Sequence, residues 1–306
     1  MKRDACVLVL GAGGFIGRHL CRALAQQGLP VLAATRQPSA FAHPMIENIS
    51  AGFTDPTDFI PLLLRSNSVI HAASASTPGS SMATPQIDGN LRTTLALVEA
   101  LQSCPGRRVL YLSSAGTLYG ERATAAVETD PLRPRSYHGA GKAAAEQFLH
   151  AWATQYEGTA IVLRPTNVYG PGQSPRTGFA IVATAMACAA TQQLLEIWGD
   201  GTQLRDYLYV EDLIDLCLKA ICTTAPSGCH VYNAASGKIV TVNHLLSLVE
   251  ATSGRHIPRK YGATRPSDIR HIAVDAGAAR IALDWHATTS LARGLAATWN
   301  WHQAQE

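Results

Sequence analysis

Short apolar runs alternate with segments of helical spacing through the first half of the chain. Uninterrupted apolar runs predict five strands, at Val7–Leu10, Val31–Ala34, Val69–Ala72, Val109–Ser113 and Ala160–Leu163. Apolar residues at helical spacing predict the helices between them, at Ile16–Gln27, Asp55–Leu64, Gly89–Leu101 and Gly139–Tyr156. Strands without polar alternation are buried on both faces. We therefore expect an α/β fold with a doubly wound parallel sheet, whose ligands bind at the carboxyl ends of the strands.

Prolines and glycines interrupt this pattern after Arg164. They recur at Pro165, Gly170, Pro171, Gly172, Pro175 and Gly178. Beyond them helices and short strands are mixed, at Ala180–Thr191, Leu194–Trp198, Glu211–Ile221 and Val242–Thr252. We therefore predict two domains. Residues 1–164, joined by about 207–221, form the large sheet, and residues 165–306 form a smaller C-terminal α/β lobe that binds the substrate.

Composition excludes several classes of function. The net charge of +3 is small and scattered, which argues against nucleic acid as a partner. The longest apolar stretch, around Ile181–Ala190, is shorter than the ~20 residues that span a bilayer, so no membrane is expected. The seven cysteines form no CxxC pair. Their odd number favours a reduced, cytoplasmic protein without disulfides, and we expect no metal site.

A glycine-rich turn joins the first predicted strand to the first predicted helix. Residues 11–17 read Gly-Ala-Gly-Gly-Phe-Ile-Gly. Gly11 permits the tight bend, Gly14 lets the backbone approach a pyrophosphate, and Gly17 lets the helix pack on the strand. The N–H groups at the start of the helix, around Phe15 and Ile16, attract phosphate groups. The turn therefore predicts a site for a dinucleotide, NAD or NADP.

The end of the second predicted strand bears on the choice of dinucleotide. Sites for NAD usually carry an acidic residue there, which holds the ribose hydroxyls. This chain has Thr35 and Arg36 instead. Because arginine suits a 2′-phosphate, the sequence slightly favours NADP over NAD. The alternative is that Arg36 is an ordinary solvated loop residue.

Further sequence motifs occur along the chain after the glycine turn. They are Val69–Ala73, Leu112–Gly120, Leu163–Gly172, Trp198–Tyr207, Val210–Asp212, Arg265–Asp268 and Leu283–Trp285. With the glycine turn and Lys142, they make the chain similar to the extended short-chain dehydrogenases/reductases. More narrowly, the chain resembles the NAD-dependent epimerase/dehydratase family. The resemblance implies a Rossmann domain for the coenzyme, a nucleotide-diphosphate sugar (UDP-linked) as substrate, and a homodimer.

The resemblance also implies roles for individual residues. The coenzyme contacts it implies, besides the glycine turn and residues 35–36, are Ala72, Ala73, Asn90, Ser113 and Lys142. The diphosphate contacts it implies are Asn167, Arg205 and Arg265, and the planar fork of arginine suits phosphate oxygens. Asp206 and Asp268 are expected to orient these arginines or to cap turns.

The catalytic segment departs from the family. In that family a tyrosine, together with a lysine four residues later, moves the proton, in a segment that reads Pro-x-Ser-x-Tyr-Gly-x-Ser-Lys. Residues 134–142 read Pro-Arg-Ser-Tyr-His-Gly-Ala-Gly-Lys, with His138 at the tyrosine position and Tyr137 one residue early. On a helix, His138 and Lys142 share a face, whereas Tyr137 and Lys142 diverge by about 140°. Three interpretations stay open: His138 is the acid/base, Tyr137 takes that role, or the site is catalytically impaired.

The hydroxyl group that shares the proton path in the family is also displaced. It belongs to a serine or threonine four residues before Tyr119, where this chain has Ala115. Thr117 or Ser114 is the expected substitute. Sugar-nucleotide dehydratases that resemble this chain carry an Asp-Glu pair where Gly116 and Thr117 stand, and without a carboxylic acid dehydration is disfavoured.

The function predicted from these residues is a nucleotide-sugar epimerase. It would resemble a UDP-hexose 4-epimerase and act by transient hydride transfer to bound NAD(P). Two alternatives remain. One is an NADPH-dependent reductase of a 4-keto nucleotide sugar, which residues 35–36 favour. The other is a catalytically impaired NAD(P)-binding homologue, which the displaced tyrosine favours.

Overall fold

The computed structural model describes residues 6–38, 41–76, 82–122, 124–176, 178–265 and 268–305. Their contacts divide the chain into two compact units. The first unit comprises residues 1–114, 137–164 and 214–232, and the second comprises residues 115–136, 165–213 and 233–306. The division differs from the predicted one in two places. Residues 115–136 group with the second unit, and the segment that returns to the first unit is Ile214–Tyr232 rather than about 207–221.

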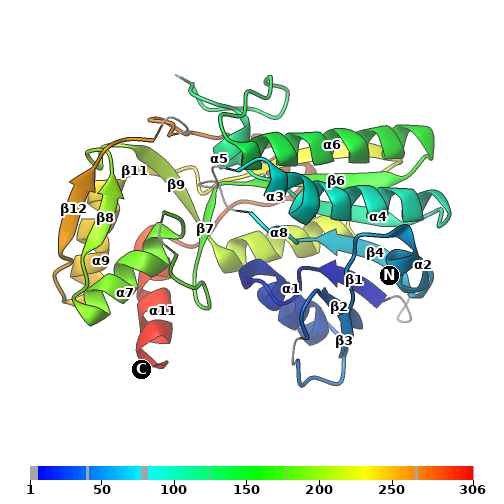
Figure 1. Ribbon diagram of the computed structural model, residues 1–306, viewed down its shortest axis with the longest axis horizontal. Coiled ribbons are helices and arrows are strands. Elements are labelled where there is room, and N and C mark those ends of the chain that lie inside the picture. Colours follow the sequence, from blue (N-terminus) through cyan, green and yellow to red (C-terminus); the bar gives the residue numbers. More distant parts are fainter. Residues whose placement is uncertain are drawn as a thin grey trace. The chain divides into compact units, whose positions relative to one another are not determined.

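The first unit is built on a seven-stranded sheet (Figure 1). Its strand order is β10-β6-β5-β4-β1-β2-β3. The bounds are β1 (Cys6–Leu10), β2 (Val31–Thr35), β3 (Ile46–Ser50), β4 (Ser66–His71), β5 (Arg108–Leu112), β6 (Thr159–Pro165) and β10 (Gly228–Ala234). Strands β1 to β6 pair in parallel. The order reverses beside β1, which in a doubly wound sheet marks the place where a ligand binds.

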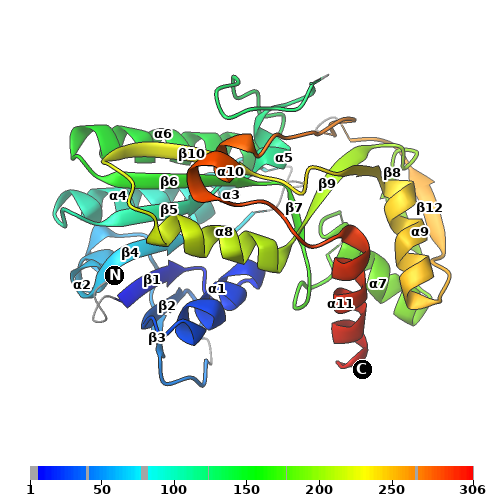
Figure 2. The same cartoon turned by 180° about the vertical axis from the view of Figure 1, so that it is seen from behind.

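Helices cover both faces of this sheet. One face carries α2 (Pro56–Arg65), α4 (Arg92–Gln102) and α6 (Tyr137–Gln155), and the other carries α1 (Phe15–Gln26) and α8 (Val210–Cys222) (Figures 1 and 2). Before α4 come a short helix α3 (Thr84–Gln86) and a π-helical turn (Ile87–Leu91). Helix α2 begins after Asp55, whose carboxylate accepts a hydrogen bond from the Thr57 N–H at 2.9 Å and so caps the helix.

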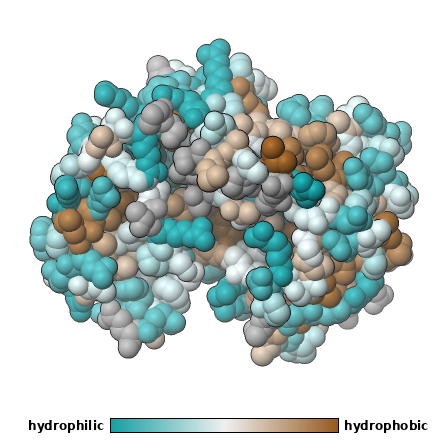
Figure 3. Space-filling model, in the orientation of Figure 1, coloured by the Kyte–Doolittle hydropathy of each residue, from teal (hydrophilic) through white to brown (hydrophobic). Residues whose placement is uncertain are grey.

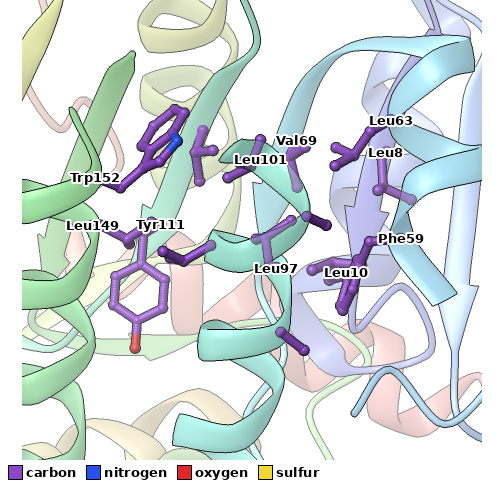
Figure 4. Packing of buried hydrophobic residues seen from close by; sticks show 14 of the residues in the cluster. Leu8, Leu10, Phe59, Leu63, Val69, Leu97, Leu101, Tyr111, Leu149 and Trp152 are labelled. Carbon is purple, nitrogen blue, oxygen red and sulfur yellow. The ribbon is translucent and has the colours of Figure 1, made fainter. Parts of the chain in front are cut away.

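The core of the first unit lies between the sheet and helices α2, α4 and α6. Figure 4 shows strand residues facing helix residues across this layer. The labelled side chains are Leu8, Leu10, Val69 and Tyr111 from the strands, Phe59 and Leu63 from α2, Leu97 and Leu101 from α4, and Leu149 and Trp152 from α6. All of them are buried. This layer holds the carboxyl ends of β1, β4 and β5 in register, where the predicted site residues stand.

The second unit contains two small sheets and its own core. Strands β7 (Asn167–Tyr169), β9 (Leu204–Tyr209) and β11 (Ile239–Thr241) form one sheet, and β8 (Leu195–Trp198) pairs with β12 (Arg259–Gly262) in the other. The helices are α5 (Ala115–Leu118), α7 (Ile181–Thr191), α9 (Val242–Ser253), α10 (Gly277–Leu283) and α11 (Leu291–Gln303). Met186, Leu246 and Trp299 pack together in one cluster. Strand β9 therefore lies in the second unit, and the predicted return of residues 207–221 begins only within α8.

The described surface mixes hydrophobic and hydrophilic residues. Figure 3 shows teal and white residues over much of the drawn face, with brown residues scattered among them. Single exposed apolar side chains of this kind include Leu64 and Ile281, and such exposure is ordinary for folded proteins. Among the described residues, no helix has both the length and the apolar character needed to cross a bilayer.

Replacing Phe59 tests the importance of the core layer. Phe59 is fully buried, so Phe59→Ala should lower the free energy of unfolding by about 3–5 kcal/mol through the cavity it leaves. Leu64 lies on the same helix and is 68% exposed, so Leu64→Ala should change that free energy by no more than about 0.5 kcal/mol. Urea denaturation of both variants gives the comparison, and similar losses would contradict this description of the core.

Candidate active site

The glycine turn brings three segments of the first unit into close approach. Gly11 has φ +79°, and a Cβ built on it would lie 2.6 Å from Cα of Ala73, at the end of β4. A Cβ on Gly17 would lie 2.8 Å from Cα of Ala12 and would overlap the carbonyl oxygen of Gly11. Helix α1 therefore packs directly on the turn, and the ends of β1 and β4 touch. No residue with a side chain fits at either position without a shift of the backbone.

The start of α1 is suited to binding an anion. Gly14 is the N-cap residue, and no side chain caps the helix there. Beside the turn, Arg18 Nε donates a hydrogen bond to the carbonyl oxygen of Gly13, at 2.9 Å. The first N–H groups of the helix, those of Phe15 and Ile16 among them, therefore have no side chain on them, and the helix dipole favours negative charge at this end. This turn fits the diphosphate of a dinucleotide.

Residues 35 and 36 differ in their exposure. Thr35 is buried, and its hydroxyl donates to the carbonyl of Gln37 at 2.5 Å. Arg36 is exposed. The Thr35 hydroxyl is thus used within the chain, and Arg36 is the residue of the two whose side chain reaches solvent.

Lys142 is buried on α6 and is tied to the end of β5. Its Nζ donates to the carbonyl of Leu112 at 2.8 Å and lies 4.7 Å from the centre of the Tyr111 ring. Burial lowers the pKa of Lys142 to about 8, although the Glu146 carboxylate opposes the shift. Glu146, one helical turn farther along, accepts a hydrogen bond from Arg164 Nη2 at 2.6 Å, and both of these side chains are buried. Buried positive and negative charges therefore alternate from Lys142 through Glu146 to Arg164.

His138 is buried on the same helix, whereas Tyr137 is not. His138 is 6% exposed, and Tyr137, the first residue of α6, is 52% exposed. The His138 Nδ1 and the Ser76 hydroxyl oxygen lie 2.9 Å apart. Burial, with a smaller contribution from the Lys142 charge, lowers the pKa of His138 to about 3, so its imidazole is neutral at pH 7. The structure places His138, rather than Tyr137, among the buried polar groups of the first unit.

Asn90 was predicted to contact the coenzyme, but its amide is used within the protein. Its Oδ1 accepts from the N–H of Ala75 at 2.7 Å. Its Nδ2 donates to the Ser76 hydroxyl at 2.7 Å and to Gln86 Oε1 at 3.0 Å. Asn90 thus holds the loop after β4 beside His138. Ser76 and Gln86 were not predicted, because nothing in their local sequence relates them to a histidine some 60 residues later.

The three candidate hydroxyls differ in their surroundings. Ser113, at the end of β5, is buried, and its Oγ has no hydrogen-bond partner among the described residues. Ser114 is half-buried in the first unit. Thr117 lies on α5 of the second unit, buried and likewise without a partner for its Oγ1 within the described part. Ala115 packs in an apolar cluster of the second unit. The orphaned Ser113 hydroxyl marks a position where a ligand could supply the missing bond.

The second unit contains a cavity beside one predicted diphosphate residue. Its volume is about 620 Å³, and its lining includes Arg265, Arg270 and Arg135 together with acidic residues such as Glu121. The Arg265 guanidinium stacks on the Trp198 indole. Three arginines around one cavity suit a ligand that carries phosphate.

The other predicted diphosphate residues stand on strands of the second unit. Arg205 is on β9, and Asn167, on β7, donates from its Nδ2 to the carbonyl of Asp206 at 2.8 Å. The buried Asp206 carboxylate accepts from the Thr166 hydroxyl at 2.6 Å and from the Ser236 N–H at 2.9 Å. Asp206 therefore connects loops of the second unit rather than orienting an arginine through an ion pair.

Asp268 closes a turn. Its carboxylate accepts from the N–H of Arg265 at 3.0 Å, and its own N–H donates to the carbonyl of Arg265 at 3.0 Å. This turn sets the direction in which the backbone presents Arg265.

Comparison with known proteins assigns the chain to a family. A model of the NAD dependent epimerase/dehydratase family matches residues 7–235, about three quarters of the chain. The chain belongs to this family. The match begins at β1, before the glycine turn, and continues through the His138–Lys142 segment to Ala235, so both units contribute to it.

Relatives in this family are 4-epimerases of nucleotide sugars. The chain is 29% identical over 304 residues to UDP-glucose 4-epimerase of Mycolicibacterium smegmatis, covering 95% of the chain and 96% of the relative. Among solved structures it is similar to MoeE5 in complex with UDP-glucuronic acid and NAD, at 31% identity and a TM-score of 0.89, covering 99% of this chain and 100% of that one. It also resembles UDP-glucose 4-epimerase of Thermotoga maritima with UDP-glucose, at 28% identity and a TM-score of 0.90, covering 98% and 99%. These relatives agree with the epimerase interpretation, and they give no support to the preference for NADP.

The close approach at Gly11 gives a test of the coenzyme site. Gly11→Ala should weaken NAD binding at least about tenfold, because the Cβ would push the ends of β1 and β4 apart. Gly28, at the end of α1, is a matched control with φ +74° and nothing within 4 Å of a Cβ. Gly28→Ala carries similar backbone strain and should leave the affinity unchanged. Isothermal titration with NAD measures both, and equal affinities would contradict the assignment.

Burial of Lys142 predicts a specific dependence of stability on pH. The pKa of Lys142 is about 8 in the folded chain and 10.5 ordinarily, so the unfolded chain binds more protons between these values. Relative to Lys142→Met, the free energy of unfolding of the wild type should therefore rise between about pH 8 and pH 10.5, by up to about 3 kcal/mol. Denaturant unfolding at several pH values measures this difference, and a constant difference would show that Lys142 is not desolvated.

Proposed function

We propose that this protein is a UDP-hexose 4-epimerase that binds NAD and uses His138 as its acid/base. The observation that supports this most is the burial of His138 and Lys142 one helical turn apart on α6. In the family the catalytic tyrosine occupies the position of His138, so this chain has an imidazole where the proton must move. A neutral imidazole can take up a proton and return it.

The first unit fits NAD. The uncapped start of α1 would hold the diphosphate, and the Ser113 hydroxyl and Lys142 are the polar groups nearest the end of β5. NAD is proposed rather than NADP because NAD is the coenzyme in solved complexes of relatives. When bound, it supplies the acceptor for the hydride that leaves the hexose, and its ring loses a positive charge as it does so. His138 can then become positive near Lys142 without raising the total charge of the site.

The second unit fits a nucleotide diphosphate. Arg265 and Arg270 line its cavity, and their charges would offset that of a diphosphate; Glu121, Asp200 and Asp268 also line it, and Arg135 pairs with Glu121 at 3.5 Å. Solved structures of relatives contain UDP-sugars, among them the UDP-glucuronic acid 4-epimerase of Bacillus cereus with UDP-glucuronic acid. A hexose on UDP is therefore the proposed substrate class.

A 4-keto-sugar reductase is the second candidate. The exposed Arg36 after β2 favours it, since an arginine there suits the 2′-phosphate of NADPH. A catalytically impaired homologue is less well supported, because His138 keeps buried polar contacts that an unused residue does not need.

The family resemblance further supports a cytoplasmic homodimer.

Assay of three variants with UDP-glucose tests the proposal. The wild type with bound NAD should interconvert UDP-glucose and UDP-galactose without net formation of NADH. His138→Ala should lower kcat by about 10²–10⁴-fold, the usual contribution of a general acid/base, with unchanged NAD affinity. Tyr137→Phe should keep wild-type activity, because that side chain is largely exposed.

The outcomes separate the alternatives. Loss of activity in Tyr137→Phe, with full activity in His138→Ala, would reassign the acid/base to Tyr137. No conversion by the wild type, but consumption of NADPH with a 4-keto nucleotide sugar, would replace the epimerase by the reductase. His138→Tyr adds a third comparison. Retained activity means that a tyrosine functions in this pocket, and total loss with NAD still bound means that the imidazole is required.

A further inference from the structure

Four polar side chains of the first unit form one hydrogen-bonded chain that ends at His138. They are Asn90 in the π-helical turn, Gln86 at the end of α3, Ser76 in the loop after β4, and His138 itself. The distances along it are 2.7 Å from Asn90 Nδ2 to Ser76 Oγ, 2.5 Å from Ser76 Oγ to Gln86 Oε1, and 2.9 Å between Ser76 Oγ and His138 Nδ1. Because the groups differ in whether they can donate, the direction of every bond can be worked out.

The direction is set at Asn90 by the backbone. The N–H of Ala75 can only donate, and it lies 2.7 Å from the Asn90 side chain, so that atom must be the oxygen Oδ1. The amide nitrogen of Asn90 therefore faces Ser76 and Gln86, and donates to both. Because Asn90 Nδ2 is a donor, the Gln86 side-chain atom 3.0 Å from it must be an acceptor, and this atom is therefore the oxygen Oε1. Neither amide can be turned over without placing two donors against each other.

The Ser76 hydroxyl then has one arrangement that satisfies all its neighbours. Its oxygen is 2.5 Å from Gln86 Oε1, and a proton must lie between these two oxygens, because two acceptors without one would repel. The single proton of Ser76 is therefore used on Gln86. Ser76 Oγ can only accept from its remaining neighbours, Asn90 Nδ2 and His138 Nδ1.

We infer that Ser76, Gln86 and Asn90 hold His138 in the tautomer that carries its proton on Nδ1, which leaves Nε2 free as the proton acceptor. Resting on the proposed function, this makes the three residues positioning residues for the base. As the O–H bond of the C4 hydroxyl breaks, its proton forms an Nε2–H bond and its electron pair forms the C4=O bond, while the hydrogen on C4 would leave as hydride to NAD. The other proton of the imidazole stays on Nδ1 and remains donated to Ser76 Oγ. The return of that proton from Nε2 to the sugar oxygen restores the starting tautomer.

Two further observations agree with this assignment. His138 is neutral at pH 7, because burial and the Lys142 charge both lower its pKa, so one tautomer is a meaningful description of it. Gly141, on the next turn of α6, lies beside Gln86: a Cβ there would be in ordinary van der Waals contact, 3.4 Å from Gln86 Cβ and 3.6 Å from Gln86 Oε1. The family pattern has a serine at this position, whose hydroxyl would compete for the Gln86 amide.

The tautomer can be measured without any sugar substrate. In protein with ¹⁵N-labelled histidine and bound NAD, long-range ¹H–¹⁵N correlation spectra at pH 7 distinguish the nitrogen that carries the proton, and His138→Gln identifies the His138 signals. The expected result is a protonated Nδ1 and an unprotonated Nε2. A proton on Nε2 would overturn the inference. Because the spectrum needs no turnover, an inactive protein with the expected tautomer would count against the proposed function alone.

Removal of the Ser76 hydroxyl tests its role in turnover. Ser76→Ala should abolish the preference for Nδ1–H and lower kcat at least about tenfold, with KM for UDP-glucose within about twofold of the wild type. Ser103→Ala, at an exposed serine after α4, is the matched control and should change neither. If Ser76→Ala does not fold, the spectrum of the wild type still decides the question. Wild-type kcat together with an unchanged tautomer in Ser76→Ala would overturn the role of Ser76.

Discussion

The hydrogen bond from the Lys142 ammonium to the carbonyl of Leu112 joins helix α6 to the end of β5. It holds a positive charge in a buried position, and the site proposed around His138 depends on that charge. Glu146 and Arg164 continue a line of alternating charges from it, so that each of these three buried charges has an opposite neighbour. Burial and, to a smaller extent, the same charge lower the pKa of His138 and keep its imidazole neutral, and only a neutral imidazole has a tautomer that its neighbours can select.

Much of the fold could be predicted because buried parallel strands leave a simple pattern. The five predicted strands correspond to β1, β2, β4, β5 and β6, with ends that differ by a few residues. Two strands of the same sheet were missed, for physical reasons. β3 is an edge strand, in which Ile46 alone is buried and polar residues are interspersed. β10 joins the sheet from a segment that follows most of the second unit in the sequence, and most of its residues are only partly buried. Local pattern contains little information about either position.

The candidate site was predictable where chemistry depends on residues close in sequence. Gly14 and Gly17 make close approaches only to atoms of the same turn, and the spacing of His138 and Lys142 follows from helical geometry alone. Gly11 has the positive φ of a tight bend, which the sequence predicts, and in addition it packs against Ala73, which the sequence does not show. Ser76 and Gln86 could not be found in this way. Their relation to His138 arises only when Ser76, five residues after β4, comes to lie beside α6 in the folded chain, and it depends on the direction of an amide that the Ala75 N–H determines. Asn90 was singled out from the sequence as a coenzyme contact, and its hydrogen bonds to Ala75, Ser76 and Gln86 were not foreseen.

The departure of this chain from the family pattern in the catalytic segment involves a small group of side chains. A histidine replaces the tyrosine, a glycine replaces the following serine, and a serine and a glutamine from other segments occupy the space around the new base. An imidazole differs from a phenol because it has two nitrogens, and the wrong one can carry the proton. The hydrogen-bonded chain through Ser76 removes that ambiguity.

The central claim is that the protein inverts C4 of a UDP-hexose by removing and returning the same hydrogen. UDP-glucose that carries deuterium at C4 tests it most directly, in ordinary water and with NAD bound. Our account predicts UDP-galactose that retains the deuterium at C4, as measured by mass spectrometry and NMR. Product that has exchanged the deuterium for solvent hydrogen, or the absence of UDP-galactose, would contradict it.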